Sequence, residues 1–276
     1  LSIQENMTLI DLVKLIRNDG FKQNRARVKV CQEIFMMKLA MSYYKDSVLF
    51  KGGTIMYQLS KEIRRSTEDV DIDLIRLSIT DQNLVKVLNQ IGSIDTGNGI
   101  SFTVVKDQIS ALKHESYEGK RVILLFKDKS DNTLKLKLDI GIHTNYQIRQ
   151  SSILFDLISS DEGIELLANP VEQMIVEKTS SFIGFGILST RMKDLYDIFY
   201  LISNFKYSKI MIIDIVEALF INTKKIKSLN QYVDMMEDLL QSDMLINNME
   251  RSDNWTGSDI SLIISKLNSF FRSLLD

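Results

Sequence analysis

Acidic and apolar residues alternate in the segment from residue 69 to 77, which reads DVDIDLIRL. A period of two is the signature of a β-strand with one polar face. That face carries Asp69, Asp71 and Asp73, while Val70 faces the core. Carboxylates spaced by two can converge on one small volume, as two-cation chemistry on phosphates requires. The segment therefore predicts a metal site in which Asp69 and Asp71 are ligands.

A third carboxylate is expected from the segment KRVILLFKDKSDNTLKLKLDIGI, residues 120 to 142. Two β-rich runs flank the polar turn from Lys129 to Asn132, which predicts a hairpin. Asp139 falls on the polar side of the second arm, near its end. Mg²⁺ or Mn²⁺ takes few protein carboxylates, because phosphate and water fill the remaining positions. Asp69, Asp71 and Asp139 are therefore predicted to suffice as metal ligands and to be catalytic.

The glycine pair Gly52-Gly53, followed by Thr54, has the form of a phosphate-binding turn. Glycine lets the backbone approach a triphosphate closely. The helix expected just beyond the turn offers free N–H donors to an anion. A short apolar strand at 48 to 50 leads into this turn, so strand, glycine turn and helix follow one another locally.

The run FKGGTIMYQLSKEIRRSTEDVDIDL resembles the first motif of nucleotidyltransferase-fold proteins. It is most similar to the AbiEii/AbiGii-type toxins, in which the motif commonly reads KGGT and then R-S-T-x-D-[IV]-D. VEQMIVEKTSSF and STRMKDLYDIFYL resemble the later E-K and R-x-K-D-x-x-D elements of that family. The matching positions are Lys51 to Thr54, Arg65, Ser66, Thr67, Asp69, Asp71, Glu177, Lys178, Arg191, Lys193, Asp194 and Asp197.

The resemblance covers about residues 48 to 200, with three motifs in the expected order. It implies that Lys178 contacts nucleotide phosphate and that Asp194 is a further essential acid. The nucleotide-binding set that it implies is Lys51, Gly52, Gly53, Thr54, Arg65, Thr67, Lys178, Arg191 and Lys193. Members serve as the toxin half of toxin–antitoxin or phage-defence pairs, and several add nucleotides to tRNA 3′ ends. NTP as substrate, tRNA as acceptor and a nearby antitoxin are the corresponding expectations.

The elements that must position these residues suggest an α/β (α+β) fold in two lobes. We expect a nucleotidyltransferase domain at 1–155, a mixed sheet with flanking helices that include two N-terminal ones separated at Gly20. From about residue 150 helical spacing dominates, which predicts a helical domain at 156–276. Its expected helices include one after Pro170, one over TRMKDLYDIFYLI and a final one from about Ile260.

Composition restricts the partners and the location. The chain has 276 residues with 34 basic and 36 acidic ones, so overall charge does not point to nucleic acid, and a local patch would have to bind it. No run of 18 apolar residues appears, and the N-terminal pattern is amphipathic, which predicts no membrane association and a cytoplasmic location. Cys31 is the only cysteine, which excludes an internal disulfide and a cysteine-rich zinc site.

Several alternatives stay open at this point. The metal pair is Asp69/Asp71 or, in a register shifted by two, Asp71/Asp73. The acidic strand could be a solvated edge face, and the motif residues from Lys178 to Asp197 could be ordinary surface ion pairs on two helices. The acceptor could be a small molecule or a protein hydroxyl, or the chain could be a non-catalytic nucleotide-binding module. His114 and His143 have no partner at ligand spacing and are expected to be structural or exposed.

Overall fold

The computed structural model describes residues 7–112, 119–143 and 150–276. The chain divides into two compact units, Leu1–Asn169 and Pro170–Asp276, which we call the sheet unit and the helical unit. The sheet unit is a mixed open sheet with flanking helices, and the helical unit is built on helices. The predicted fold class is confirmed.

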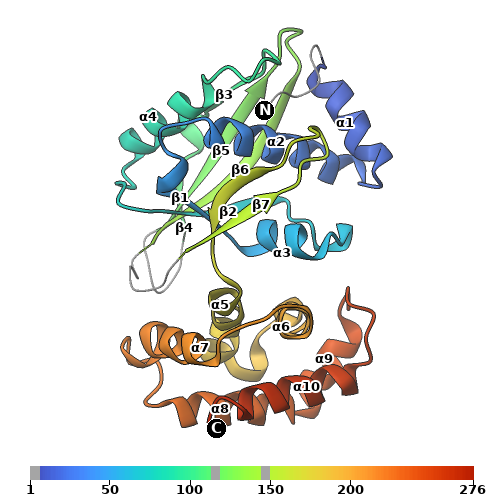
Figure 1. The fold of residues 1–276 in the computed structure, drawn as a ribbon, viewed down its shortest axis with the longest axis vertical. Helices are drawn as coiled ribbons and strands as arrows, with labels where there is room; N and C mark the ends of the chain where they lie inside the picture. Colours follow the sequence, from blue (N-terminus) through green and yellow to red (C-terminus); the bar gives the residue numbers. More distant parts are fainter. Residues whose placement is uncertain (1–6, 113–118, 144–149) are drawn as a thin grey trace. The chain divides into compact units, whose positions relative to one another are not determined.

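One sheet organises the first unit (Figure 1). Its strand order is β3-β5-β6-β2-β1-β8-β7, with β4 paired to β5. The pairs β2–β6 and β1–β8 are parallel, and the other pairs are antiparallel. The strands are β1 (Val48–Lys51), β2 (Asp69–Leu74), β3 (Ser101–Val104), β4 (Ser110–Leu112), β5 (Gly119–Lys127), β6 (Thr133–Ile142), β7 (Ser151–Phe155) and β8 (Ile164–Ala168).

Helices cover one face of this sheet. The two N-terminal helices are α1 (Leu9–Asn18) and α2 (Gln23–Ala40), with Gly20 between them at φ +103°, as the sequence predicted. Helix α2 lies across the sheet against β6 and β8 (Figure 1). Helix α3 (Gly52–Ser60) follows β1 directly, and α4 (Asp81–Gly92) packs on β3.

Core packing decides which way β2 faces. Val70 and Ile72 are fully buried, as are Leu138 and Ile140 on the neighbouring strand β6. Because side chains alternate along a strand, burial of Val70 and Ile72 turns Asp69, Asp71 and Asp73 to the other face. A slip of one residue would turn the three carboxylates toward the core and the apolar set away from it, so the register is strongly determined.

The strands β7 and β8 differ from the sequence prediction. The prediction that helices dominate from about residue 150 was wrong for residues 151–168, because β7 and β8 in this segment form an antiparallel pair of strands. Phe50 of β1 pairs with Ala168 of β8, so this pair completes the sheet. The compact units accordingly divide after Asn169, whereas the expected boundary was residue 155. Five-residue strands show too little periodicity to be recognised without the partner strand, which lies far away in the sequence.

The helical unit begins with α5 (Val171–Phe185), whose N-cap residue is Pro170. Helix α5 packs on α6 (Met192–Asn204), and α8 (Leu229–Leu240) packs on α10 (Ile260–Arg272). The helices predicted after Pro170, over the TRMKDLYDIFYLI segment and from Ile260 are confirmed. The remaining α-helices are α7 (Lys209–Val216) and α9 (Asp243–Arg251). Among the described residues, no helix has the length and apolar character to cross a membrane.

Candidate active site

Asp71 occupies the centre of an acidic group on the sheet face opposite α2. Its position on β2 pairs with Lys51 of β1 on one side and with Asp139 of β6 on the other. Paired strands lie about 4.8 Å apart, so Asp71 and Asp139 are immediate neighbours on one face. The hairpin predicted from the sequence brings Asp139 here, because β6 is its second arm.

Two basic residues that the sequence reasoning missed bind the outer carboxylates. Arg121 of β5 donates from Nε and Nη2 to the two oxygens of Asp139, each at 2.7 Å. Its Nη2 also lies 3.8 Å from Asp69 Oδ2, and Lys137 Nζ lies 2.9 Å from Asp69 Oδ1. The bonds to Asp139 and the nearby carboxylates raise the pKa of Arg121 further above its usual value. Residues 121 and 139 are equidistant from Ser130, so the predicted hairpin turn could have identified this pair.

Asp73 has a different environment from Asp69 and Asp71. It is buried, at 7% exposure, and its Oδ1 lies 2.6 Å from Lys51 Nζ. Asp69 and Asp71 are both partly exposed. The structure therefore leaves Asp69 and Asp71 as the accessible members of the three-acid run, and it places Lys51 against Asp73.

The glycine turn lies directly against the acids. Gly52 has φ +65°, and a Cβ built there would lie 2.5 Å from Asp71 Oδ2. A Cβ on Gly53 would lie 2.8 Å from the Thr67 Cβ. Both glycines are thus needed for close approach, one to the carboxylate and one to the segment that leads into β2.

Helix α3 begins at Gly52, at the end of β1. Its N-cap residue, Lys51, makes no side-chain capping bond, so first-turn N–H groups remain as donors for an anion. Thr54 is buried, and its Oγ1 has no hydrogen-bond partner among the residues that the structure describes. An uncapped helix start beside an orphaned hydroxyl fits a phosphate-binding turn.

The Arg65-Ser66-Thr67 segment connects the glycine turn to β2. The Asp69 N–H donates to Thr67 Oγ1 at 3.3 Å, and Gln32 Nε2 donates to the Thr67 carbonyl at 3.2 Å. Thr67 therefore fixes the start of β2 relative to α2. Arg65 ends a short 3-10 turn, Ile63–Arg65, and is half-buried.

The donor set suits a hard divalent cation by residue type. Three carboxylates share one face, and the space between Gly52 and the Asp71 carboxylate would be filled by any Cβ. Across the described ranges, however, no three Asp, Glu, His or Cys side chains converge as metal ligands do. Asp139 and Asp69 are instead held in ion pairs with Arg121 and Lys137.

The second group of motif residues lies inside the helical unit. Lys178 Nζ of α5 lies 3.1 Å from Asp194 Oδ1 and 2.5 Å from Asp197 Oδ2 of α6. All three residues are buried. Trp255 Nε1 also donates to Asp197 Oδ1 at 3.0 Å, a partner that the sequence reasoning missed. These three charges form a buried cluster between two helices, not the surface pairs of the alternative interpretation.

Arg191 and Lys193 flank this cluster at the start of α6. Burial opposes ionisation of Asp194, but Lys178 and Arg191 outweigh it and lower the pKa of Asp194 below its ordinary value. Arg191 Nε lies 2.5 Å from Asp194 Oδ2. Lys193 is half exposed, and its Nζ lies 3.9 Å from Asp253, so it makes a surface pair.

Of the two histidines, His143 lies among the described residues. His143 is buried, and its Nε2 lies 2.8 Å from Gln150 Nε2, which is a structural contact. His114 lies outside the described residues.

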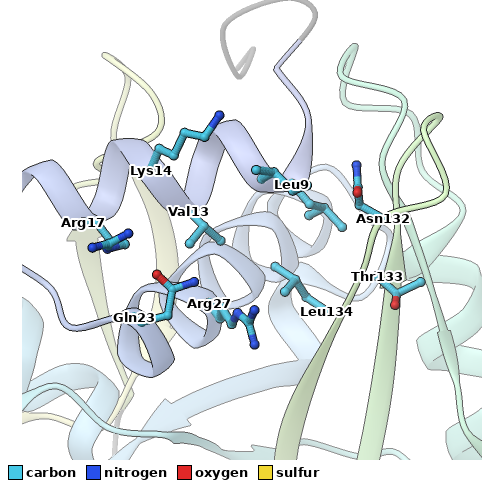
Figure 2. Close-up of a pocket in the computed structure, with 10 residues that line it drawn as sticks. Leu9, Val13, Lys14, Arg17, Gln23, Arg27, Asn132, Thr133 and Leu134 are labelled. Atoms are coloured by element: carbon cyan, nitrogen blue, oxygen red, sulfur yellow. The ribbon is translucent and has the colours of Figure 1, made fainter.

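A separate pocket of about 380 Å³ lies at the other end of β6, beside Thr133 and Leu134. Helix α1 and the start of α2 contribute Val13, Arg17 and Arg27 to its wall (Figure 2). This pocket shares no residue with the acidic group. The candidate site is therefore identified by its carboxylates and its glycine turn, and not by a pocket.

Comparison with known proteins gives one family. Residues 34–258 match a family model described as nucleotidyl transferase AbiEii toxin, type IV TA system. No curated protein matches the chain. The matched segment covers most of the chain and includes both groups of motif residues.

Proposed function

The chain belongs to the AbiEii nucleotidyltransferase toxin family of type IV toxin–antitoxin systems, and from that premise we propose that it transfers NMP from an NTP to tRNA in a reaction that requires a divalent cation. The family accounts for the nucleotidyltransferase activity and the toxin–antitoxin context. The cation, the acceptor and the residue roles are our proposals.

The pairing of Asp71 with Asp139 on adjacent parallel strands carries the proposal. Asp69 lies two residues from Asp71 on the same face, and Gly52 lies against the Asp71 carboxylate. Asp69, Asp71 and Asp139 would hold the divalent cations, which when bound activate the attacking oxygen and neutralise the leaving pyrophosphate.

The chain's own groups would bind and orient the triphosphate. Lys51 provides no side-chain cap to the first turn of α3, and the Thr54 hydroxyl has no partner among the described residues; both features favour donation to phosphate oxygens. Asp139 is the proposed base for the acceptor hydroxyl, because it lies at the rim of the group and next to Asp71. Arg65 and Thr67 would support the turn from the adjoining segment.

Lys178, Arg191, Lys193 and Asp194 keep their proposed nucleotide-related roles. Lys178 already neutralises two buried carboxylates. To contact a phosphate, its ammonium group would have to bind the phosphate and these carboxylates together. Arg191 is well suited to phosphate, because its side chain is two-thirds exposed while it holds Asp194. Lys193 lies at the surface, 3.9 Å from Asp253.

The decisive experiment incubates the protein with each labelled NTP and total cellular RNA, and then treats the products with RNase or protease. Label that is lost with RNase and depends on added Mg²⁺ or Mn²⁺ is the expected result. Asp71→Asn is the inactive control, and EDTA is the cation control.

Other outcomes separate the alternatives. Label that resists RNase but is lost with protease would replace tRNA by a protein acceptor, and label that resists both would indicate a small molecule. NTP binding without transfer to any acceptor would indicate a nucleotide-binding module. Rescue of growth by the neighbouring gene's product would identify the proposed antitoxin.

A further inference from the structure

Arg121 contacts two of the candidate metal ligands. It uses two guanidinium nitrogens on the two oxygens of Asp139 and reaches Asp69 at 3.8 Å. Lys137 lies 2.9 Å from the same Asp69. Two protein cations thus neutralise the two outer carboxylates, while Asp71 lies between them.

We propose that Arg121 is an exchangeable counterion of this acidic group, which must release Asp139 before a divalent cation can bind there. The proposal rests on the proposed function for its requirement for a divalent cation. It assigns to Arg121 a positioning role that none of the sequence motifs includes.

The geometry makes the two occupants mutually exclusive at Asp139. A fork-shaped guanidinium that bonds both carboxylate oxygens occupies the edge that a cation would use. A divalent cation carries twice the charge and coordinates oxygen directly, so it competes for the same lone pairs.

Exposure makes the exchange feasible. The Arg121 side chain is 38% exposed and the Asp139 side chain 16% exposed, so the guanidinium can leave into solvent. Exposed ion pairs contribute little to stability, because solvent screens them. Arginine keeps its charge in proteins, so a competing cation must displace Arg121 from Asp139.

Arg121 also stabilises the acidic group when no divalent cation is bound. Asp69, Asp71 and Asp139 lie on neighbouring positions of one face, where like charges repel. Arg121 relieves this repulsion and preserves the side-chain arrangement. Once released, its guanidinium remains on the face that holds the acids and suits bidentate contact with phosphate.

The test measures Mn²⁺ binding to the full chain by calorimetry, without nucleotide. Arg121→Gln is expected to bind Mn²⁺ roughly three- to tenfold more tightly than wild type, since the competing charge is gone. Lys127→Gln is the matched control, because Lys127 lies on the same strand and face and pairs with Asp131 instead. Its Mn²⁺ affinity should equal that of wild type.

Thermal unfolding gives a second readout. Without cation, Arg121→Gln should unfold at a lower temperature than wild type, and saturating Mn²⁺ should reduce the difference. In an Asp139→Asn background the affinity gain from Arg121→Gln should disappear, because the competition takes place at Asp139. Arg121→Lys, which retains the charge without the fork, should fall between wild type and Arg121→Gln and serves if the glutamine variant does not fold.

Equal or weaker Mn²⁺ binding by Arg121→Gln, with binding retained by wild type, would overturn this proposal alone. Absence of Mn²⁺ binding to wild type and to Arg121→Gln would overturn both this proposal and the cation requirement of the proposed function.

Discussion

The backbone of Gly52 lies so close to Asp71 that a Cβ at Gly52 would be 2.5 Å from the Asp71 Oδ2 atom. The glycine turn and the central carboxylate are therefore in close contact: the glycine that opens α3 also limits where the carboxylate can lie. This contact joins two motifs that are separated in the sequence.

Gly52→Ala should reduce nucleotide transfer by about a hundredfold, because the new methyl group must displace the Asp71 carboxylate. The positive φ adds about 1 kcal/mol of strain to the folded state. Gly97→Ala is the matched control: its φ is +79°, yet a Cβ added there would meet nothing within 4 Å. Similar unfolding free energies with activity lost only in Gly52→Ala would support the contact; equal activity would refute it.

Asp71→Asn should lower transfer by more than about a hundredfold, because it weakens a proposed metal ligand while preserving shape. Asp73→Asn should instead cost about 1 kcal/mol of unfolding free energy, through its pairing with Lys51, and retain most activity. Transfer assays and denaturant unfolding of both variants distinguish the two registers. The opposite ranking would indicate that Asp73 is a member of the metal pair.

Lys178→Met should destabilise the helical unit by about 3 to 5 kcal/mol, since Asp194 and Asp197 would be left as buried charges without their amine. Lys193→Met, an exposed neighbour on α6, should change stability by less than about 0.5 kcal/mol. Trp255 is the only tryptophan and is buried beside Asp197, so its fluorescence follows this unit. Equal stability of the two variants would show that the buried cluster is not formed.

Acid should destabilise the helical unit through Asp194. Its pKa is lowered in the folded state from an ordinary value of 3.8, so its contribution is present above pH 3.8 and is lost as the pH falls through the folded pKa. Urea unfolding followed by Trp255 fluorescence at about pH 6 and about pH 3 measures the loss. Asp194→Asn should show a smaller difference between the two pH values, and an unchanged difference would contradict the assignment.

The sequence by itself determined that the acidic residues lie on one face of a strand, and it determined the local elements around them. Alternation over residues 69 to 77 predicted that Asp69 and Asp71 share a face, and burial of Val70 and Ile72 is the reason the structure agrees. The hairpin around Ser130 and the helix after Pro170 followed from local patterns too. Such features depend on residues close in sequence, so periodicity and turn chemistry suffice to predict them.

Tertiary structure alone decided what each charged group binds. Arg121 also approaches Asp69, on a strand outside its own hairpin, and Lys178 meets Asp194 and Asp197 between two helices. The strands β7 and β8 likewise gain their place through the pairing of Phe50 with Ala168. These outcomes depend on register and packing between segments that are distant in the sequence. Coulomb attraction and burial act between such segments through space, so they produce no periodic pattern along the chain.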